Sequence, residues 1–219
     1  MHKTIENLNY IQNQINSKIL KLNNNYRPKI IAISKTFKID HILPLVNHGH
    51  EDFGENKVQE GLEKWTDIKS KNKNIKLHMV GKLQTNKVKF VLPLFDYIHS
   101  LDNIKLAKKI SEEQKKHLNK PKIFIQINIA NEEQKSGIDK NQVLDFYKEC
   151  MKLELDIVGT MCLPPINQDP NNFFLEMRNI NNNLQLNELS MGMSEDYIKA
   201  IEHYSTFLRI GSKIFGKRN

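Results

Sequence analysis

The chain has 219 residues, two cysteines and a formal net charge of +8, and a chain of this length can bury a substantial core within one domain. Cys150 and Cys162 are too few for a disulfide framework and lie in no metal-ligand pattern, which favours a reducing, cytoplasmic setting. No window is apolar enough for a signal peptide or a membrane span, and the lysines are scattered instead of forming a basic stripe. We therefore expect a soluble protein with neither a membrane nor a nucleic-acid partner.

The predicted elements begin with one helix and continue as alternating strands and helices. Apolar residues at helical spacing predict the opening helix over residues 3–23. Short apolar segments bounded by polar or glycine-containing turns predict eight strands, at 29–34, 50–55, 77–81, 96–101, 122–129, 155–162, 187–192 and 207–212. Amphipathic stretches predict helices at 38–48, 56–70, 84–92, 102–117, 139–152, 171–184 and 194–203.

A strand followed by a helix, repeated eight times, indicates the α/β class and a closed parallel (β/α)8 barrel, the TIM-barrel fold. We expect residues 1–219 to form a single domain of this kind with an extra N-terminal helix. A doubly wound open sheet is the alternative, but it usually has fewer strands and a glycine-rich GxGxxG turn, which this chain lacks.

The first predicted strand ends in a lysine, Lys35. In such barrels the chemistry lies at the carboxyl ends of the strands and in the loops that follow them. A lysine that is partly desolvated there is favoured in its neutral, nucleophilic form, which can condense with an aldehyde. A solvated strand end is the simpler explanation of a lone lysine, so its interpretation depends on what the other strands supply.

The last two strands supply groups that could bind a phosphate. Ser190 offers a hydroxyl, and Gly211 and Ser212 offer backbone N–H groups, at the position where barrels frequently bind phosphate. A lysine opposite a phosphate cup suggests an aldehyde that carries a phosphate, of which pyridoxal 5′-phosphate is the obvious candidate. Arg209 strengthens this hypothesis, because it lies on the same face of its strand as Gly211. An arginine has only donors, so a pyridine nitrogen facing it would have to stay unprotonated, which makes the ring a poor electron sink.

Six spaced motifs resemble the signatures of the pyridoxal phosphate homeostasis proteins: "IAISKT", "FGENKVQE", "HMVGKLQTNK", "INIANEEQKSG", "LSMGMSEDYIKAIE" and "RIGSKIFG". The resemblance implies a barrel similar to the N-terminal domain of alanine racemase, with pyridoxal phosphate held as a Schiff base on Lys35. It also implies that Ser190, Gly211 and Ser212 hold the phosphate, that Arg209 faces the ring nitrogen and that Asn56 lines the site. The family is implicated in supplying or buffering the cofactor and in amino-acid balance, without an established catalytic reaction.

Three positions depart from the family pattern, namely Tyr204, Lys57 and Phe37. If Tyr204 follows its helix in a left-handed conformation, a tyrosine there costs on the order of 1 kcal/mol. The segment Lys135–Ser136–Gly137 matches a family feature whose role stays open, with a surface turn as the simpler interpretation.

Three other residues have competing interpretations. Met161 either fills the barrel or packs against the cofactor ring. His78 is expected to be a hydrogen-bonded core histidine and not an acid or base. Cys162 is expected to be a small buried hydrophobe and not a nucleophile.

Three functions are compatible with these residues. The favoured one is a cofactor-binding homeostasis protein without catalytic residues, expected as a monomer that passes pyridoxal phosphate to apo enzymes. The alternative is a small racemase-like enzyme, but racemisation needs an acid/base group on each face of the substrate carbon. The resemblance to alanine racemase implies that the second acid/base group is a tyrosine on a separate domain. These 219 residues leave no room for such a domain. A phosphosugar-binding barrel with Lys35 as an aldolase-type base would leave Arg209 unexplained.

Overall fold

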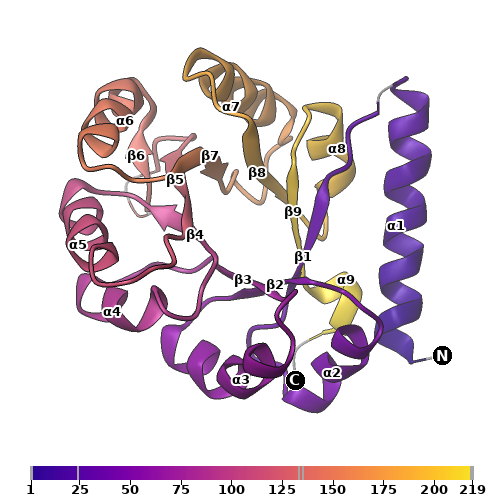
Figure 1. The fold of residues 1–219 in the computed structure, drawn as a ribbon. Coiled ribbons are helices and arrows are strands. Elements are labelled where there is room, and N and C mark those ends of the chain that lie inside the picture. Colours follow the sequence, from indigo (N-terminus) through magenta and orange to yellow (C-terminus); the bar gives the residue numbers. More distant parts are fainter. Residues whose placement is uncertain (1, 24, 133, 135, 218–219) are drawn as a thin grey trace.

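A computed structural model describes residues 2–23, 25–132, 134 and 136–217, and its strands form a closed parallel barrel (Figure 1). Eight strands make up the barrel wall: β1 (Lys29–Ile33), β2 (Asp52–Glu55), β3 (Lys76–Met79), β4 (Tyr97–Leu101), β5 (Lys122–Asn128), β7 (Ile157–Cys162), β8 (Glu188–Met193) and β9 (Phe207–Ile210). Each pairs in parallel with its neighbours, and the pairing of β4 with β5 closes the ring. The predicted (β/α)8 fold is confirmed.

Helices follow the strands and cover the outside of the barrel (Figure 1). They are α2 (Ile39–Asn47), α3 (Val58–Lys71), α4 (Val88–Val91), α5 (Ile104–Gln114), α6 (Val143–Lys152), α7 (Asn171–Asn183), α8 (Tyr197–Glu202) and α9 (Ser212–Phe215), with 3-10 turns η1 (Thr85–Lys87) and η2 (Lys140–Gln142). The opening helix, α1 (Lys3–Lys21), lies against α8, α9 and α2 and buries one stripe of its side chains, namely Leu8, Ile11, Ile15 and Ile19. The predicted extra N-terminal helix is therefore present.

Several segments differ from the sequence-based expectation, among them the helix expected over 139–152, which begins only at Val143 after the turn η2. The helix expected over 84–92 is a 3-10 turn followed by the single-turn α4, and the one expected over 194–203 begins only at Tyr197. A short strand, β6 (Ile138–Asp139), pairs with β5, and α9 follows β9 directly. Elements of two to four residues are too short to show a period of 2.0 or 3.6 in sequence, so periodicity could not predict β6 or α9.

The buried side chains form two clusters that the sheet separates. The larger one fills the space between the strands and the surrounding helices. The smaller one fills the inside of the barrel and consists of Ile31, Ile33, Tyr97, Phe124, Met161 and Phe207. Because side chains alternate across a strand, the residues of β1 with odd numbers face inward, and Lys35 continues this series beyond the strand's end. The barrel interior is therefore packed, and Lys35 lies at its mouth.

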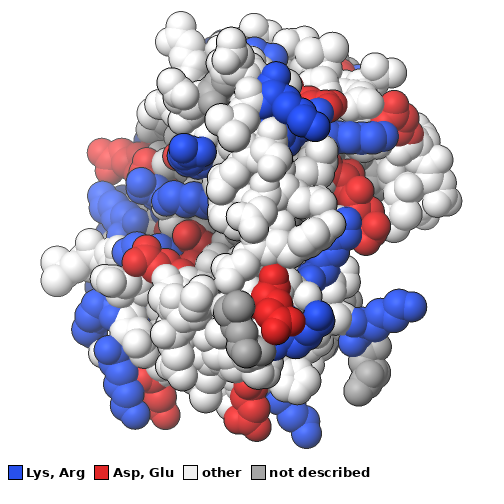
Figure 2. All heavy atoms as spheres, turned by 90° about the vertical axis from the view of Figure 1, so that its right-hand side faces the viewer, with Lys and Arg blue, Asp and Glu red and all other residues white. Residues whose placement is uncertain are grey.

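Charged residues of both signs are interspersed on the face that carries α1, which Figure 2 shows, and do not form one basic stripe on that face. Within the described part of the chain, no helix combines the length and apolar character needed to cross a membrane. Cys150 and Cys162 are both buried and no disulfide joins them, and the burial of Cys162 agrees with the prediction from the sequence.

Candidate functional site

A cavity of about 640 Å³ opens at the carboxyl ends of the strands. Its lining comes mainly from the loops after β1, β2, β7, β8 and β9, and includes Lys35, Asn56, Leu163, Pro164, Pro165, Met193, Ser194, Arg209, Gly211 and Ser212. Small-molecule sites in proteins commonly have volumes of about 300–1,000 Å³. The cavity therefore has the size and position of a ligand site in a barrel of this type.

Five of the seven site residues predicted from the sequence line this cavity: Lys35, Asn56, Arg209, Gly211 and Ser212. Met161 and Ser190 do not line it, because both lie inside the barrel and are almost completely buried. Their strands continue beyond them, to Cys162 and Met193 respectively, so the residues that reach the mouth come later in the chain. Ser194, directly after β8, lines the cavity, although the sequence analysis named Ser190 as the serine of the site.

Arg209 forms the floor of the cavity and is held there by two hydrogen bonds. Its Nη1 donates to Ser190 Oγ at 2.6 Å, and its Nη2 donates to the carbonyl oxygen of Cys162 at 2.7 Å. Only 5 % of Arg209 is exposed, and burial lowers the pKa of its guanidinium. An arginine still keeps its proton in proteins, so the floor carries a fixed donor group.

The turn after β9 lies in the same lining as Arg209. The helix α9 begins at Ser212, directly after Gly211, and the first N–H groups of a helix have no partner within that helix. A Cβ atom at Gly211 would lie 3.3 Å from the Cβ of Ile33, so glycine allows the close approach of this turn to β1. Ser194 is connected to the same turn, since its Oγ accepts a long hydrogen bond of 3.4 Å from the N–H of Lys213.

The end of β1, which carries Lys35, is fixed by polar contacts on the outer side of the barrel. Ser34 donates its hydroxyl to Glu55 Oε1 at 2.7 Å, and its carbonyl oxygen accepts from Lys64 Nζ at 2.8 Å. Thr36 adopts a left-handed conformation with φ of 68°, and its N–H donates to Glu60. The residues on both sides of Lys35 are therefore held from the α3 side, which leaves the lysine directed to the cavity that it lines.

Glu55 is the centre of these outer contacts. Besides Ser34, its Oε1 accepts from Lys64 Nζ at 3.1 Å and from the indole N–H of Trp65 at 3.0 Å. Burial raises the pKa of Glu55, and these three donors oppose that shift.

Sequence comparisons identify the chain's family. The sequence profile described as "Alanine racemase, N-terminal domain" matches residues 8–219. A protein of Haemophilus influenzae named "Pyridoxal phosphate homeostasis protein" is 38% identical over 97% of this chain and 95% of its own length. A mouse protein of the same name is 35% identical over 88% of this chain and 78% of its own length. The chain belongs to the pyridoxal phosphate homeostasis protein family.

Solved structures agree with this family assignment. PipY of Synechococcus elongatus, solved with pyridoxal phosphate bound, is 28% identical and superposes with a TM-score of 0.81 over 92% of this chain and all of PipY. An alanine racemase of Clostridium difficile is only 14% identical, with a TM-score of 0.73 over 98% of this chain and 56% of the racemase. The second similarity shows the shared barrel fold alone.

The three positions that depart from the family pattern are not among the residues that line the cavity. Lys57 is exposed at the start of α3, and Phe37 stacks on Phe215 with ring centroids 5.0 Å apart. Tyr204 lies at the amino-terminal side of β9, after α8. Lys135 lies outside the described residues, while the carbonyl oxygen of Ser136 accepts from Gln126 Nε2 at 3.0 Å.

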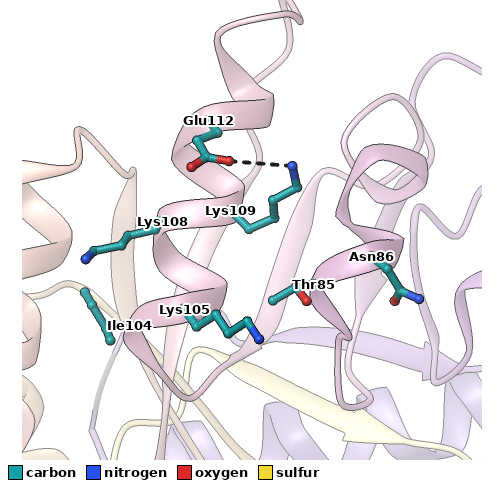
Figure 3. Close-up of a pocket in the computed structure, with 7 residues that line it drawn as sticks. All are labelled: Thr85, Asn86, Ile104, Lys105, Lys108, Lys109 and Glu112. Carbon is teal, nitrogen blue, oxygen red and sulfur yellow. Dashed lines mark ion pairs between the residues drawn. The ribbon is translucent and has the colours of Figure 1, made fainter.

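A second hollow, of about 530 Å³, lies on the outside of the barrel between η1 and α5 (Figure 3). In Figure 3, the side chain of Lys108 extends to the side of α5 opposite Thr85 and Asn86, and Lys109 pairs with Glu112 at 3.5 Å. These side chains do not converge on one point, in contrast to the groups at the barrel mouth. Among the described residues, no group of three or more histidine, cysteine, aspartate or glutamate side chains could hold a metal ion.

The cavity at the mouth fits the family's cofactor on three observations of this chain. It has a lysine at its wall, a buried guanidinium at its floor and a turn of backbone N–H groups beside that guanidinium. An aldehyde, a ring nitrogen and a phosphate would each find a chemically suitable group among them.

Proposed function

We propose that this protein binds pyridoxal 5′-phosphate at the barrel mouth and serves in its homeostasis, holding the cofactor reversibly and releasing it to apo enzymes. The observation that carries the proposal is that Lys35 and Arg209 line the same cavity, together with the turn at Gly211 and Ser212. The names of the Haemophilus influenzae and mouse relatives, and the pyridoxal phosphate in PipY, support it.

Each group of the site has a part in the proposal. When bound, pyridoxal phosphate supplies a carbonyl electrophile, and the amine of Lys35 is the nucleophile that would hold it covalently as a Schiff base. The N–H groups at Gly211 and Ser212, with the hydroxyl of Ser194, would hold the phosphate, and Asn56 would line the wall of the site. Ser190 and Met161 would act from below, Ser190 by holding Arg209 and Met161 by filling the barrel.

The same arrangement argues against efficient turnover. Arg209 has no acceptor atom, so a ring nitrogen facing it accepts a hydrogen bond and receives no proton. Carbanion chemistry relies on a ring that withdraws electrons strongly, and an unprotonated ring does so poorly. We infer that the protein stores and delivers the cofactor; a slow racemase-like activity is the alternative.

The test combines cofactor transfer with a search for turnover. The holo protein, freed of unbound cofactor, is mixed with an apo pyridoxal phosphate enzyme, and recovery of that enzyme's activity is followed. In parallel, catalytic amounts are incubated with each common L-amino acid while product chirality and carbon dioxide are measured. We expect reactivation and little turnover; turnover near the ordinary enzyme median of about 10 per second would replace this proposal by the racemase-like one.

A further inference from the structure

Behind Arg209, four hydrogen-bonded side chains cross the inside of the barrel. Ser190 Oγ, which accepts from Arg209, lies 2.9 Å from Nδ1 of His99. Nε2 of His99 lies 2.9 Å from Nδ1 of His78, and Nε2 of His78 lies 3.0 Å from Oδ1 of Asp52. The contacts thus connect the cavity floor to the first residue of β2, at the opposite end of the barrel.

Aromatic packing holds this row of side chains rigidly. His78 stacks on Tyr97 with ring centroids 4.3 Å apart, and His99 stacks on Phe124 at the same distance. Ser190, His78 and His99 are completely buried, so each polar atom must find its partner within the barrel. A ring that is stacked on one face and hydrogen-bonded at both nitrogens has little freedom to turn.

The two ends of the row determine the direction of every hydrogen bond in it. Arg209 can only donate, so Ser190 accepts from it and has one hydroxyl hydrogen left for Nδ1 of His99. A neutral His99 then carries its proton on Nε2 and donates to Nδ1 of His78. By the same rule His78 donates from Nε2 to Asp52, whose carboxylate can only accept. All donors and acceptors are matched when both histidines are neutral and carry the proton on Nε2.

We propose that Ser190, His99, His78 and Asp52 are positioning residues that form a one-directional hydrogen-bond chain and aim Arg209 at the bound ligand's ring. In this hydrogen-bond chain Nη1 of Arg209 donates to Ser190, and Nη2 donates to the carbonyl oxygen of Cys162. The remaining N–H groups of the guanidinium are left for the ligand. This role rests on the proposed function, because it concerns the ring nitrogen of pyridoxal phosphate.

The direction of the chain can be tested without any cofactor. Long-range ¹H–¹⁵N correlation spectra of the ¹⁵N-labelled apo protein at neutral pH report which nitrogen of each histidine carries the proton. We expect His78 and His99 to be neutral, with the proton on Nε2 in both. A proton on Nδ1 of His99, or a cationic ring at either position, would overturn the assigned direction. This result does not depend on whether pyridoxal phosphate binds.

The positioning role is tested by His99→Phe, which keeps the aromatic packing and breaks the chain. We expect the dissociation constant for pyridoxal phosphate, measured by absorbance titration, to rise roughly three- to tenfold, the effect of losing one ordinary hydrogen bond. His203→Phe is the matched control, because His203 ends α8 beside Phe174 on the outside of the barrel and makes no contact with the four residues of the hydrogen-bond chain. An unchanged affinity in His99→Phe, with cofactor still bound at Lys35, would refute the positioning role alone. Failure of the wild-type protein to bind cofactor at Lys35 would instead refute the proposed function.

Discussion

Single residues at the barrel mouth were predictable where they follow directly after a strand. Lys35 and Asn56 follow the ends of β1 and β2, and both line the cavity as the sequence indicated. Ser190 lies in the middle of β8, so its side chain is inside the barrel, whereas Ser194 lies just beyond the end of that strand. The two serines differ in their position relative to the end of β8, which decides whether a side chain lies inside the barrel or at its mouth. The sequence motif "SMGMS" does not indicate at which residue β8 ends.

The histidine chain behind Arg209 was only half predictable. A core histidine with hydrogen bonds was expected at His78, and the structure confirms it. Its connection through His99 to Ser190 joins β4 to β8, two strands that do not pair. Contacts across a barrel interior depend on the closure of the ring and leave no periodic pattern in the sequence.

Replacing Arg209 by lysine tests its role as a donor fork. A lysine is a compact ammonium without the planar geometry that reaches Ser190 and the Cys162 carbonyl oxygen at once. We expect Arg209→Lys to weaken pyridoxal phosphate binding by about tenfold or more, since a hydrogen bond to a charged group contributes about 1.5–3 kcal/mol. Arg178→Lys, which changes an arginine stacked on Tyr204, is the control. Equal affinities and absorption spectra for wild type and Arg209→Lys would remove the ring-nitrogen role.

At the scale of elements, short apolar segments predicted all eight barrel strands, because each is buried and bounded by turns. The helices were predicted less well where tertiary contacts replace periodicity. The stretch 84–92 has apolar residues at helical spacing, yet only Val88–Val91 is α-helical. The N–H of Phe95 then donates to the carbonyl oxygen of Val91, which turns the chain towards β4.

The turn at the end of α8 contains a tyrosine, Tyr204, in a backbone conformation that is unfavourable for residues other than glycine. Tyr204 has a φ of 63°, the N–H of Ser205 donates to Ala200 and the N–H of Tyr204 donates to Ile201. This is the Schellman arrangement, whose left-handed position usually holds glycine. The conformation foreseen for Tyr204 is therefore present, and the Arg178 guanidinium, 4.0 Å from the ring centre, offsets part of its cost.

Two substitutions separate the backbone cost from the ring contact at this helix end. Tyr204→Gly and Tyr204→Ala both remove the ring, but only glycine tolerates the left-handed conformation without strain. We expect Tyr204→Ala to unfold more easily than Tyr204→Gly, by about 1 kcal/mol in the free energy of unfolding from urea titrations. An alanine variant as stable as the glycine variant would show that this conformation carries no such cost.

For the whole molecule, the buried histidines make stability depend on pH. Burial lowers the pKa of His78 and His50, and holds the pKa of His99 well below its usual value. In the unfolded chain each histidine takes up a proton below about pH 6.5, while the folded protein does not until lower pH. The unfolded state therefore binds more protons in this window, and stability falls as the pH falls.

We expect the free energy of unfolding to decrease below about pH 6.5, with about 1.4 kcal/mol per pH unit as the limit for each histidine. The raised pKa of Glu55 acts in the opposite sense, because that carboxyl binds its proton more readily in the folded state. Comparing wild type with His99→Phe isolates one histidine, since the variant lacks its contribution to the slope. Identical slopes for the two proteins would contradict the buried neutral state of His99.

The most direct test of the proposed site is to locate the covalent bond to pyridoxal phosphate. The purified protein is loaded with the cofactor, reduced with borohydride and mapped by peptide mass spectrometry. Lys35→Ala should lose the adduct, whereas Lys199→Ala, which removes another lysine of the cavity lining, should keep it. We expect the reduced cofactor on Lys35; an adduct found mainly on any other lysine would contradict the proposed site.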